Sequence, residues 1–224
     1  MSFYIEKNKK YFTNVRYDLI KLLPVNPEAK VLEIGAGGGD TLIEIKKKNL
    51  AKEVVGIELM EMPESNQLHP LIDKFLISNI ETGTLPFLDS YFDVILIGDV
   101  LEHLVNPWKT VERLSKYLKK GGVFIVSAPN IRFIKAFIKI FLKGDFAYEK
   151  QGLFDKTHLR FFCKKNIEQL FSTNCLRVES IIPIDKLWDD GKVYKKKVFN
   201  KITFGIFEEF LTLQYIVVAK KYAD

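Results

Sequence analysis

A chain of 224 residues, 47% of them hydrophobic, can bury one sizeable core and not comfortably two, so we expect a single domain over 1–224. No apolar run reaches the roughly 20 residues that span a bilayer, and the N-terminus lacks a signal-peptide pattern, which together predict a cytoplasmic protein. The net charge is +6, and Cys163 and Cys175 have no partner at metal-ligand spacing, so neither a disulfide framework nor a metal site is expected.

Short β-branched runs alternate with segments of helical periodicity, which is typical of βαβ units and a mainly parallel sheet. The last two strands have little helix between them, which suggests an antiparallel hairpin at one sheet edge. We therefore expect an α/β fold with an antiparallel edge strand and a helical insertion after the fifth strand. The expected elements are helix 7–23, strand 30–34, helix 40–49, strand 53–58, a short helix or turn after 63, strands 74–77 and 92–97, helix 107–120, strand 123–127, helices 131–143 and 164–172, and strands 176–182 and 212–219.

The segment 131–165 carries nine Lys or Arg against three acidic residues, whereas 61–102 carries eight acidic residues against one lysine. Four basic residues from Arg132 to Lys143 recur every three or four positions, so they share one face of a helix whose other faces are apolar. We interpret 131–165 as a substrate-side insertion or lid that packs over the open end of the sheet. Its basic side could instead be solvated, or could contact phosphates, acidic sugars or an anionic membrane surface.

The segment from Val31 to Asp40 has the order of a buried strand, a glycine turn and a helix start. In an open α/β sheet such a turn lies at the carboxyl ends of the strands, where ligands bind. The dinucleotide fingerprint G-x-G-x-x-G would require glycine where Asp40 stands, which weakens a pyrophosphate-binding interpretation. An acid at the helix start and Glu33 before the turn favour a ligand that carries positive charge.

The strand that ends at Glu58 places a carboxylate about 20 residues beyond the glycines, where it can accept hydrogen bonds from both hydroxyls of a ribose. Dinucleotide enzymes share this feature. It therefore indicates an adenosine ligand and does not by itself indicate a reaction.

These motifs, together with Phe92-Asp93-Val94, the run from Asp99 to Leu104 and the pair Gly121-Gly122, resemble the class I S-adenosylmethionine-dependent methyltransferases. The motifs stand in the family's order between about 31 and 130. The resemblance implies a Rossmann-like, doubly wound sheet of about seven strands, with S-adenosylmethionine as cofactor and S-adenosylhomocysteine as product. By the same resemblance Glu33, Gly35, Ala36 and Gly37 lie along the methionine portion, Glu58 and Leu59 at the ribose, Asn79 and Ile80 at the adenine edge, and Asp99 beside the amino-acid end or the transferring methyl.

The stretch from Pro129-Asn130 through 152–162 resembles a narrower group, the bacterial methyltransferases often associated with glycosyltransferases and surface-polysaccharide synthesis. That resemblance implies that the methyl acceptor is a hydroxyl of a small molecule, a sugar or a glycan intermediate. It also implies that the basic helix after Asn130 forms part of a lid over the acceptor.

A hydroxyl acceptor needs a base, and two of the three histidines, His103 and His158, lie in candidate site motifs. Either imidazole could accept a hydroxyl proton near neutral pH. Alternatively, His103 could orient a loop by bonding a carbonyl or carboxylate, and His158 could bond within its own loop.

Two other functions compete with this interpretation. A nucleic-acid methyltransferase would suit the basic insertion and would let Phe161 and Phe162 stack on bases, although paired Phe residues are more often core. After the fourth strand, residues 98–103 stand where amino-methylating enzymes carry a polar-Pro-Pro-aromatic motif. Nucleic acid is therefore the less favoured partner. A cofactor-binding pseudoenzyme is the other alternative.

Overall fold

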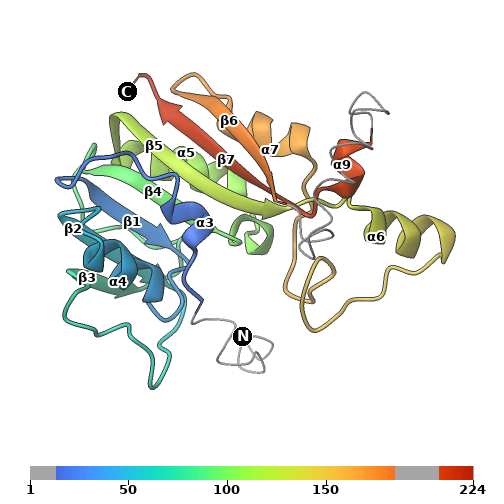
Figure 1. The fold of residues 1–224 in the computed structure, drawn as a ribbon, viewed down its shortest axis with the longest axis horizontal. Helices are drawn as coiled ribbons and strands as arrows, with labels where there is room; N and C mark the ends of the chain where they lie inside the picture. The colour runs from blue at the N-terminus through green and yellow to red at the C-terminus, as the bar shows by residue number, and fades with distance from the viewer. Residues whose placement is uncertain (1–13, 185–206, 224) are drawn as a thin grey trace.

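The computed structural model describes residues 14–184 and 207–223, which form one seven-stranded sheet in the order β3-β2-β1-β4-β5-β7-β6 (Figure 1). Adjacent strands from β3 to β5 are parallel, and β7 runs antiparallel to both β5 and β6. The expected α/β fold with antiparallel pairing at one edge is confirmed. The elements are α3 (Tyr17–Ile20), β1 (Lys30–Ile34), α4 (Asp40–Lys47), β2 (Glu53–Glu58), β3 (Lys74–Ile77), β4 (Phe92–Gly98), η1 (Leu101–His103), α5 (Pro107–Tyr117), β5 (Leu118–Pro129), α6 (Ile134–Phe137), the π-helix η2 (Ile138–Leu142), α7 (Lys164–Phe171), β6 (Leu176–Ile184), α9 (Glu208–Leu211) and β7 (Gln214–Lys221).

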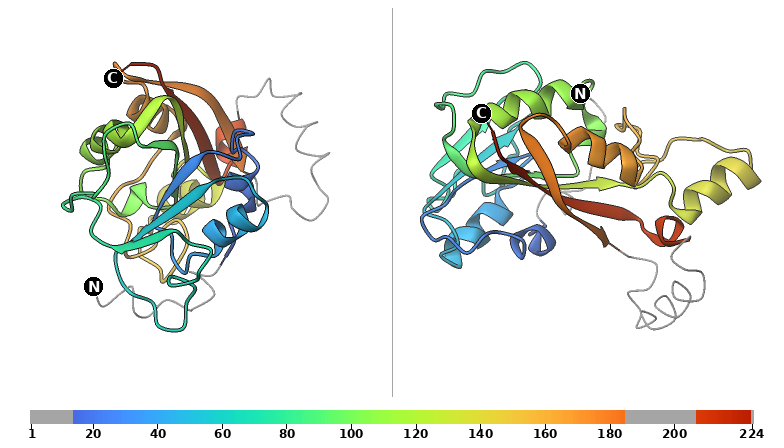
Figure 2. Two further views of the ribbon diagram at one scale, coloured as in Figure 1. Left: turned by 90° about the vertical axis from the view of Figure 1, so that its left-hand side faces the viewer. Right: turned by 90° about the horizontal axis from the view of Figure 1, so that it is seen from above.

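Helices cover both faces of the sheet, α3 and α4 on one and α5 and α7 on the other (Figure 2). Successive residues of β1 serve opposite faces: Val31 packs with Leu42 of α4, and Leu32 belongs to the same cluster as Leu114 of α5. A strand buried on both faces reads as a continuous apolar run, which is why β1, β2 and β4 could be recognised in the sequence.

The N-terminal helix is shorter than expected in the part of the chain that the structure describes. The expectation was 7–23, of which 7–13 lie outside the described residues, and α3 occupies Tyr17–Ile20.

Helix α5 begins as the sequence predicts and ends earlier. The Asn106 side chain accepts a hydrogen bond from the Lys109 amide, and Pro107 occupies the first helical position. We expected the helix to run to Lys120, but it ends at Tyr117 because Leu118 is fully buried and pairs with Phe92 as the first residue of β5. The glycines at 121 and 122 thus lie inside a strand instead of ending the helix.

The insertion helix does not pack over the open end of the sheet, contrary to expectation. It begins at Ile134, continues as η2 to Leu142, and projects past the end of β5 (Figure 1). Its Phe137 packs edge-to-face on Phe210 of α9, with ring centroids 5.9 Å apart. None of the helices in the described ranges is both long enough and apolar enough to cross a bilayer.

Candidate functional site

A pocket of about 800 Å³, here called the strand-end pocket, opens at the carboxyl ends of β1, β2 and β4. The last residues of these strands, Ile34, Glu58 and Gly98, all line it. This is the edge of an open parallel sheet where ligands bind. The nine residues that the sequence placed at a cofactor all line the pocket: Glu33, Gly35, Ala36, Gly37, Glu58, Leu59, Asn79, Ile80 and Asp99.

The turn after β1 requires glycine at Gly35. This residue has φ of +69°, and a Cβ there would come within 2.3 Å of Val100 Cγ2. Glycine at this position therefore lets the Val100 side chain pack directly against the turn at the pocket wall.

Glu58 closes this turn from the end of β2. Its Oε2 accepts a hydrogen bond from the Gly37 amide at 2.9 Å, and its Oε1 accepts one from the Leu59 amide at 2.7 Å. Burial raises the pKa of Glu58, and these two amides oppose the rise. The carboxylate is thereby held in one orientation at the pocket wall.

Glu33 is a buried acid whose oxygen Oε2 has no hydrogen-bond partner in the part of the chain that the structure describes. Burial raises its pKa to about 8, against the opposing effects of the Arg16 charge and a hydrogen bond from Thr41. An unpartnered buried carboxyl oxygen is costly, and a cationic donor in the pocket would satisfy it and favour the ionised form.

This pKa predicts a pH-dependent difference between the wild-type chain and Glu33→Gln. Between about pH 4.5 and 8 the unfolded chain has ionised Glu33 while the folded chain keeps the proton, so stability falls as the pH rises, by at most about 1.4 kcal/mol per pH unit. The fall ends above the folded pKa. Glu33→Gln should lack this contribution, so urea unfolding of both proteins from pH 5 to 9 should show the variant gaining relative stability with pH. A constant difference would contradict the assignment.

Asp99 lies at the pocket beside a residue that the sequence did not reveal, Arg16. Asp99 has φ of +56°, and its carboxylate accepts hydrogen bonds from Arg16 Nη1 at 2.8 Å, from Ser127 Oγ at 2.9 Å and from the side-chain Nε2 of Gln214. Burial by itself lowers the pKa of Arg16, but the hydrogen bond to Asp18 and the charge of Asp99 raise it on balance. Arg16 belongs to no sequence motif, and only folding brings it to the end of β4.

Asn79 combines a place in the pocket wall with a turn-forming role. Its Oδ1 accepts from the Glu81 amide at 2.8 Å, and its backbone carbonyl accepts from the Gly83 amide at 2.8 Å. The turn leaves one lone pair of Oδ1 for a ligand.

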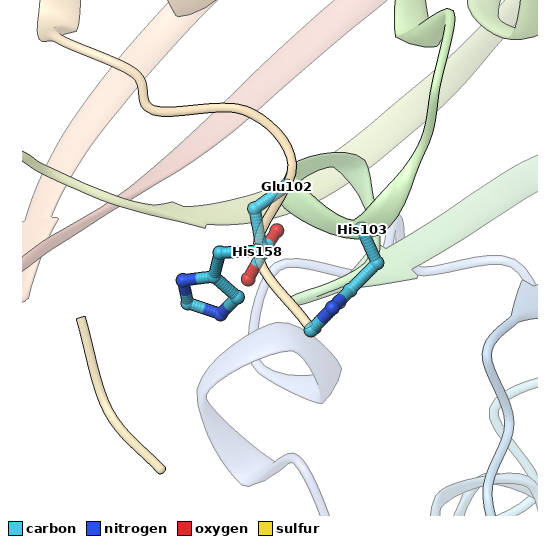
Figure 3. Close-up of side chains that lie close together, drawn as sticks. All are labelled: Glu102, His103 and His158. Atoms are coloured by element: carbon cyan, nitrogen blue, oxygen red, sulfur yellow. The ribbon is translucent and has the colours of Figure 1, made fainter. Parts of the chain in front are cut away.

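His103 lines the strand-end pocket, and His158, whose side chain lies close to that of His103 (Figure 3), does not. The Nδ1 atom of His103 lies 3.0 Å from the Thr157 carbonyl, and that of His158 lies 3.0 Å from the Leu153 carbonyl. The two rings are in edge-to-face contact, with centroids 4.8 Å apart. His158 is 7% exposed. Its hydrogen bond to the Leu153 carbonyl lies within its own loop, as one of the two alternatives for this residue predicted.

Glu102, which the sequence analysis did not single out, joins this pair. Its side chain is 2% exposed, and its carboxylate and the two imidazoles each offer a ligand atom within 4.8 Å of the others. The pattern of apolar residues around Glu102 did not indicate its role. This acid lies in the helix η1, which is too short to show a helical or strand periodicity.

The residues that could have stacked on nucleic-acid bases are mainly structural. Phe162 is 3% exposed and part of the core, and Phe161 packs on Phe146 with ring centroids 5.6 Å apart.

Comparison with known proteins gives a family match over most of the chain. The sequence model of the family described as "Methyltransferase domain" matches residues 8–181. A mitochondrial ubiquinone biosynthesis O-methyltransferase of Dictyostelium discoideum is 26% identical over 167 residues, which are 67% of this chain and 50% of that protein. The chain thus spans about half the length of that curated relative.

Solved structures share the fold at low sequence identity. A SAM-dependent methyltransferase from Archaeoglobus fulgidus superposes with a TM-score of 0.62 at 16% identity, covering 96% of this chain and 95% of the other. A Burkholderia thailandensis 1,6-didemethyltoxoflavin-N1-methyltransferase with bound S-adenosylhomocysteine gives a TM-score of 0.62 at 14% identity, covering 100% of this chain and 84% of the other.

Proposed function

Because this chain belongs to the methyltransferase-domain family, we propose that it transfers a methyl group from S-adenosylmethionine to a hydroxyl oxygen of a small acceptor. The observation that carries the proposal is the strand-end pocket, where nine residues expected at this cofactor meet. The structural likeness to a methyltransferase with bound S-adenosylhomocysteine supports the same cofactor class.

The residues of the pocket fit this cofactor. The unpartnered oxygen of Glu33 suits the cofactor's ammonium group, and the glycine turn from Gly35 to Gly37, which lines the pocket, would lie along its methionine portion. Glu58, held by two amides, suits the ribose hydroxyls, and Asn79 with the Ile80 amide suits the adenine edge. Asp99, bound to Arg16, would lie beside the amino-acid end or the transferring methyl.

The cofactor supplies an electrophilic methyl group on a sulfonium, so the chain's own task is to align the acceptor and remove its proton. Alignment of reacting groups contributes on the order of 7–11 kcal/mol in well-oriented reactions. Among the residues that line the strand-end pocket, His103 is the histidine that could accept the proton of the acceptor hydroxyl. A carbonyl can only accept, so Nδ1 donates to Thr157 and Nε2 of the neutral ring carries the lone pair.

The acceptor we favour is a hydroxyl of a sugar or glycan intermediate. The segment that carries the narrower resemblance packs beside His103: the backbone amides of Leu159 and Arg160 donate to the Glu102 carbonyl at 2.7 and 2.9 Å. The O-methyltransferase name of the Dictyostelium relative supports oxygen as the acceptor atom. Within 131–165, the loop whose Thr157 carbonyl bonds the His103 ring would form the acceptor wall, while α6 and η2 lie further out.

The test is methyl transfer from S-adenosylmethionine with a labelled methyl group to a panel of simple sugar glycosides, a catechol and a mixed RNA. We expect label on a sugar hydroxyl, identified by mass spectrometry of the product. Label on RNA alone would favour the nucleic-acid alternative. Tight cofactor binding without transfer to any class would favour the pseudoenzyme.

A further inference from the structure

We propose that Glu102, His103 and His158 form a binding site for a divalent transition-metal ion of the Zn²⁺ type (Figure 3). The sequence led us to expect no metal site, because its cysteines lack metal-ligand spacing. The three candidate ligands come instead from η1 and from a loop far along the chain.

The three side chains converge closely enough for one ion to bridge them. One ligand atom from each lies within 4.8 Å of the others, and Glu102 and His158 are 2% and 7% exposed. Bonds of about 2.0–2.2 Å to a tetrahedral ion separate neighbouring ligand atoms by about 3.4 Å. Movement of each side chain by about an ångström or less would therefore complete the coordination.

Both imidazoles make a hydrogen bond of the kind that metal-binding histidines make. Each Nδ1 lies 3.0 Å from a backbone carbonyl, Thr157 for His103 and Leu153 for His158. Because a carbonyl can only accept, each Nδ1 carries the proton and each Nε2 carries a lone pair in the neutral ring. A second ring nitrogen bonded to a carbonyl is the usual arrangement around a metal-bound histidine.

Backbone hydrogen bonds hold the two segments together without an ion. The Glu102 carbonyl accepts from the amides of Leu159 and Arg160. Asp155 Oδ1 accepts from both the amide and the hydroxyl of Thr157, at 2.9 and 2.7 Å, and so shapes the loop that carries His158. The site is thus largely formed before binding, which lowers the entropic cost of capturing an ion.

The ligand types select the class of ion. Two neutral imidazoles and one carboxylate suit Zn²⁺ and Co²⁺, whereas Mg²⁺ and Ca²⁺ prefer sites made of oxygen ligands. Three protein ligands also leave a coordination position open, as in catalytic zinc sites. His103 lines the strand-end pocket, so the cluster adjoins that pocket.

A role for such an ion in methyl transfer rests on the proposed function. An ion beside the acceptor would lower the pKa of the acceptor hydroxyl, and the proton would leave to water. Because the ion would occupy the Nε2 lone pair of His103, it would replace proton acceptance by that imidazole in the metal-loaded protein. Binding of the ion itself does not depend on the proposed reaction.

The experiment is titration of the untagged, chelator-treated full chain with Co²⁺, followed by its visible absorption, and then displacement with Zn²⁺. We expect about one ion per chain by elemental analysis and stronger binding of Zn²⁺ than of Mg²⁺. Glu102→Gln and His158→Gln should each weaken Co²⁺ binding by at least about 10-fold, because loss of a ligand should cost no less than loss of an outer-shell partner. Binding should also weaken as the pH falls, since protons compete for the imidazoles.

His69→Gln is the matched control, because His69 is the remaining histidine and lies outside the cluster. Cys163→Ser controls for binding by a thiol. Circular dichroism and calorimetric titration with S-adenosylmethionine identify variants that have lost their fold; if His158→Gln is one of them, Glu102→Gln carries the test.

Absence of stoichiometric Co²⁺ binding, or equal binding by wild type, Glu102→Gln and His158→Gln, would overturn the inference. Cofactor binding without Co²⁺ binding would reject the metal site alone, and Co²⁺ binding without cofactor binding would reject the proposed function alone.

Discussion

Replacement of His103 by Ala should lower turnover by about 10²- to 10⁴-fold, the contribution of a positioned acid–base group, while the affinity for S-adenosylmethionine stays unchanged. His103 lines the pocket, and its Nδ1 is bonded to the Thr157 carbonyl, so substitution removes the proton acceptor without disturbing Glu33 or Glu58. The measurement is the initial rate of methyl transfer at saturating cofactor, with cofactor affinity determined separately by calorimetry.

The pH profile of the methyl-transfer rate distinguishes loss of the proton acceptor from general disruption of the fold. The wild-type rate should fall at low pH as the His103 lone pair is protonated, and His103→Ala should lack that limb. His69→Ala, at a histidine outside the pocket, should retain both the rate and the profile. Near-normal turnover of His103→Ala would show that this residue does not take part in the reaction. Repeating the assay with a chelator and with Zn²⁺ would show whether an ion changes the fall of the rate at low pH.

Glu58→Ala should weaken S-adenosylmethionine binding by about 100-fold, because a hydrogen bond to a charged group contributes roughly 1.5–3 kcal/mol and the ribose offers two hydroxyls. The substitution also removes the acceptor for the Gly37 and Leu59 amides, which loosens the glycine turn. Calorimetric titration with S-adenosylmethionine, S-adenosylhomocysteine and NAD measures the effect.

Glu58→Gln provides the control for shape, since its carbonyl oxygen can still accept one hydrogen bond. We expect its affinity to lie between those of wild type and Glu58→Ala. Unchanged affinity in Glu58→Ala would show that this carboxylate does not hold the ribose, and preferential NAD binding by the wild type would reject the cofactor assignment.

The strands and the pocket wall could be predicted because their signals are local. Strands buried on both faces read as continuous apolar runs, and the central sheet strands β1, β2 and β4 appear at their expected positions. Residues at strand ends meet once the strands are parallel, which predicted that Glu58 lies near the glycine turn. The family resemblance added Glu33 and Asp99 to the same pocket before the structure was known.

The errors concern elements whose ends depend on contacts made elsewhere in the fold. The glycines at 121 and 122 suggested a helix stop, but burial of Leu118 and its pairing with Phe92 end α5 earlier. The amphipathic pattern of the insertion indicated a helix correctly, yet periodicity carries no information on where a helix packs. Contact with Phe210 places α6 beyond the end of β5.

By itself the sequence determined the α/β class, the succession of strands along the chain and the glycine turn, because each depends on residue types at short spacing. The family resemblance of its motifs pointed to residues that line the strand-end pocket. Only the tertiary structure brought Arg16 to Asp99, and Glu102 and His103 to His158. Those groups lie far apart in the sequence and show no shared periodicity, so their proximity follows from the packing of whole elements. That packing decides which histidine faces the pocket and which charged groups surround it.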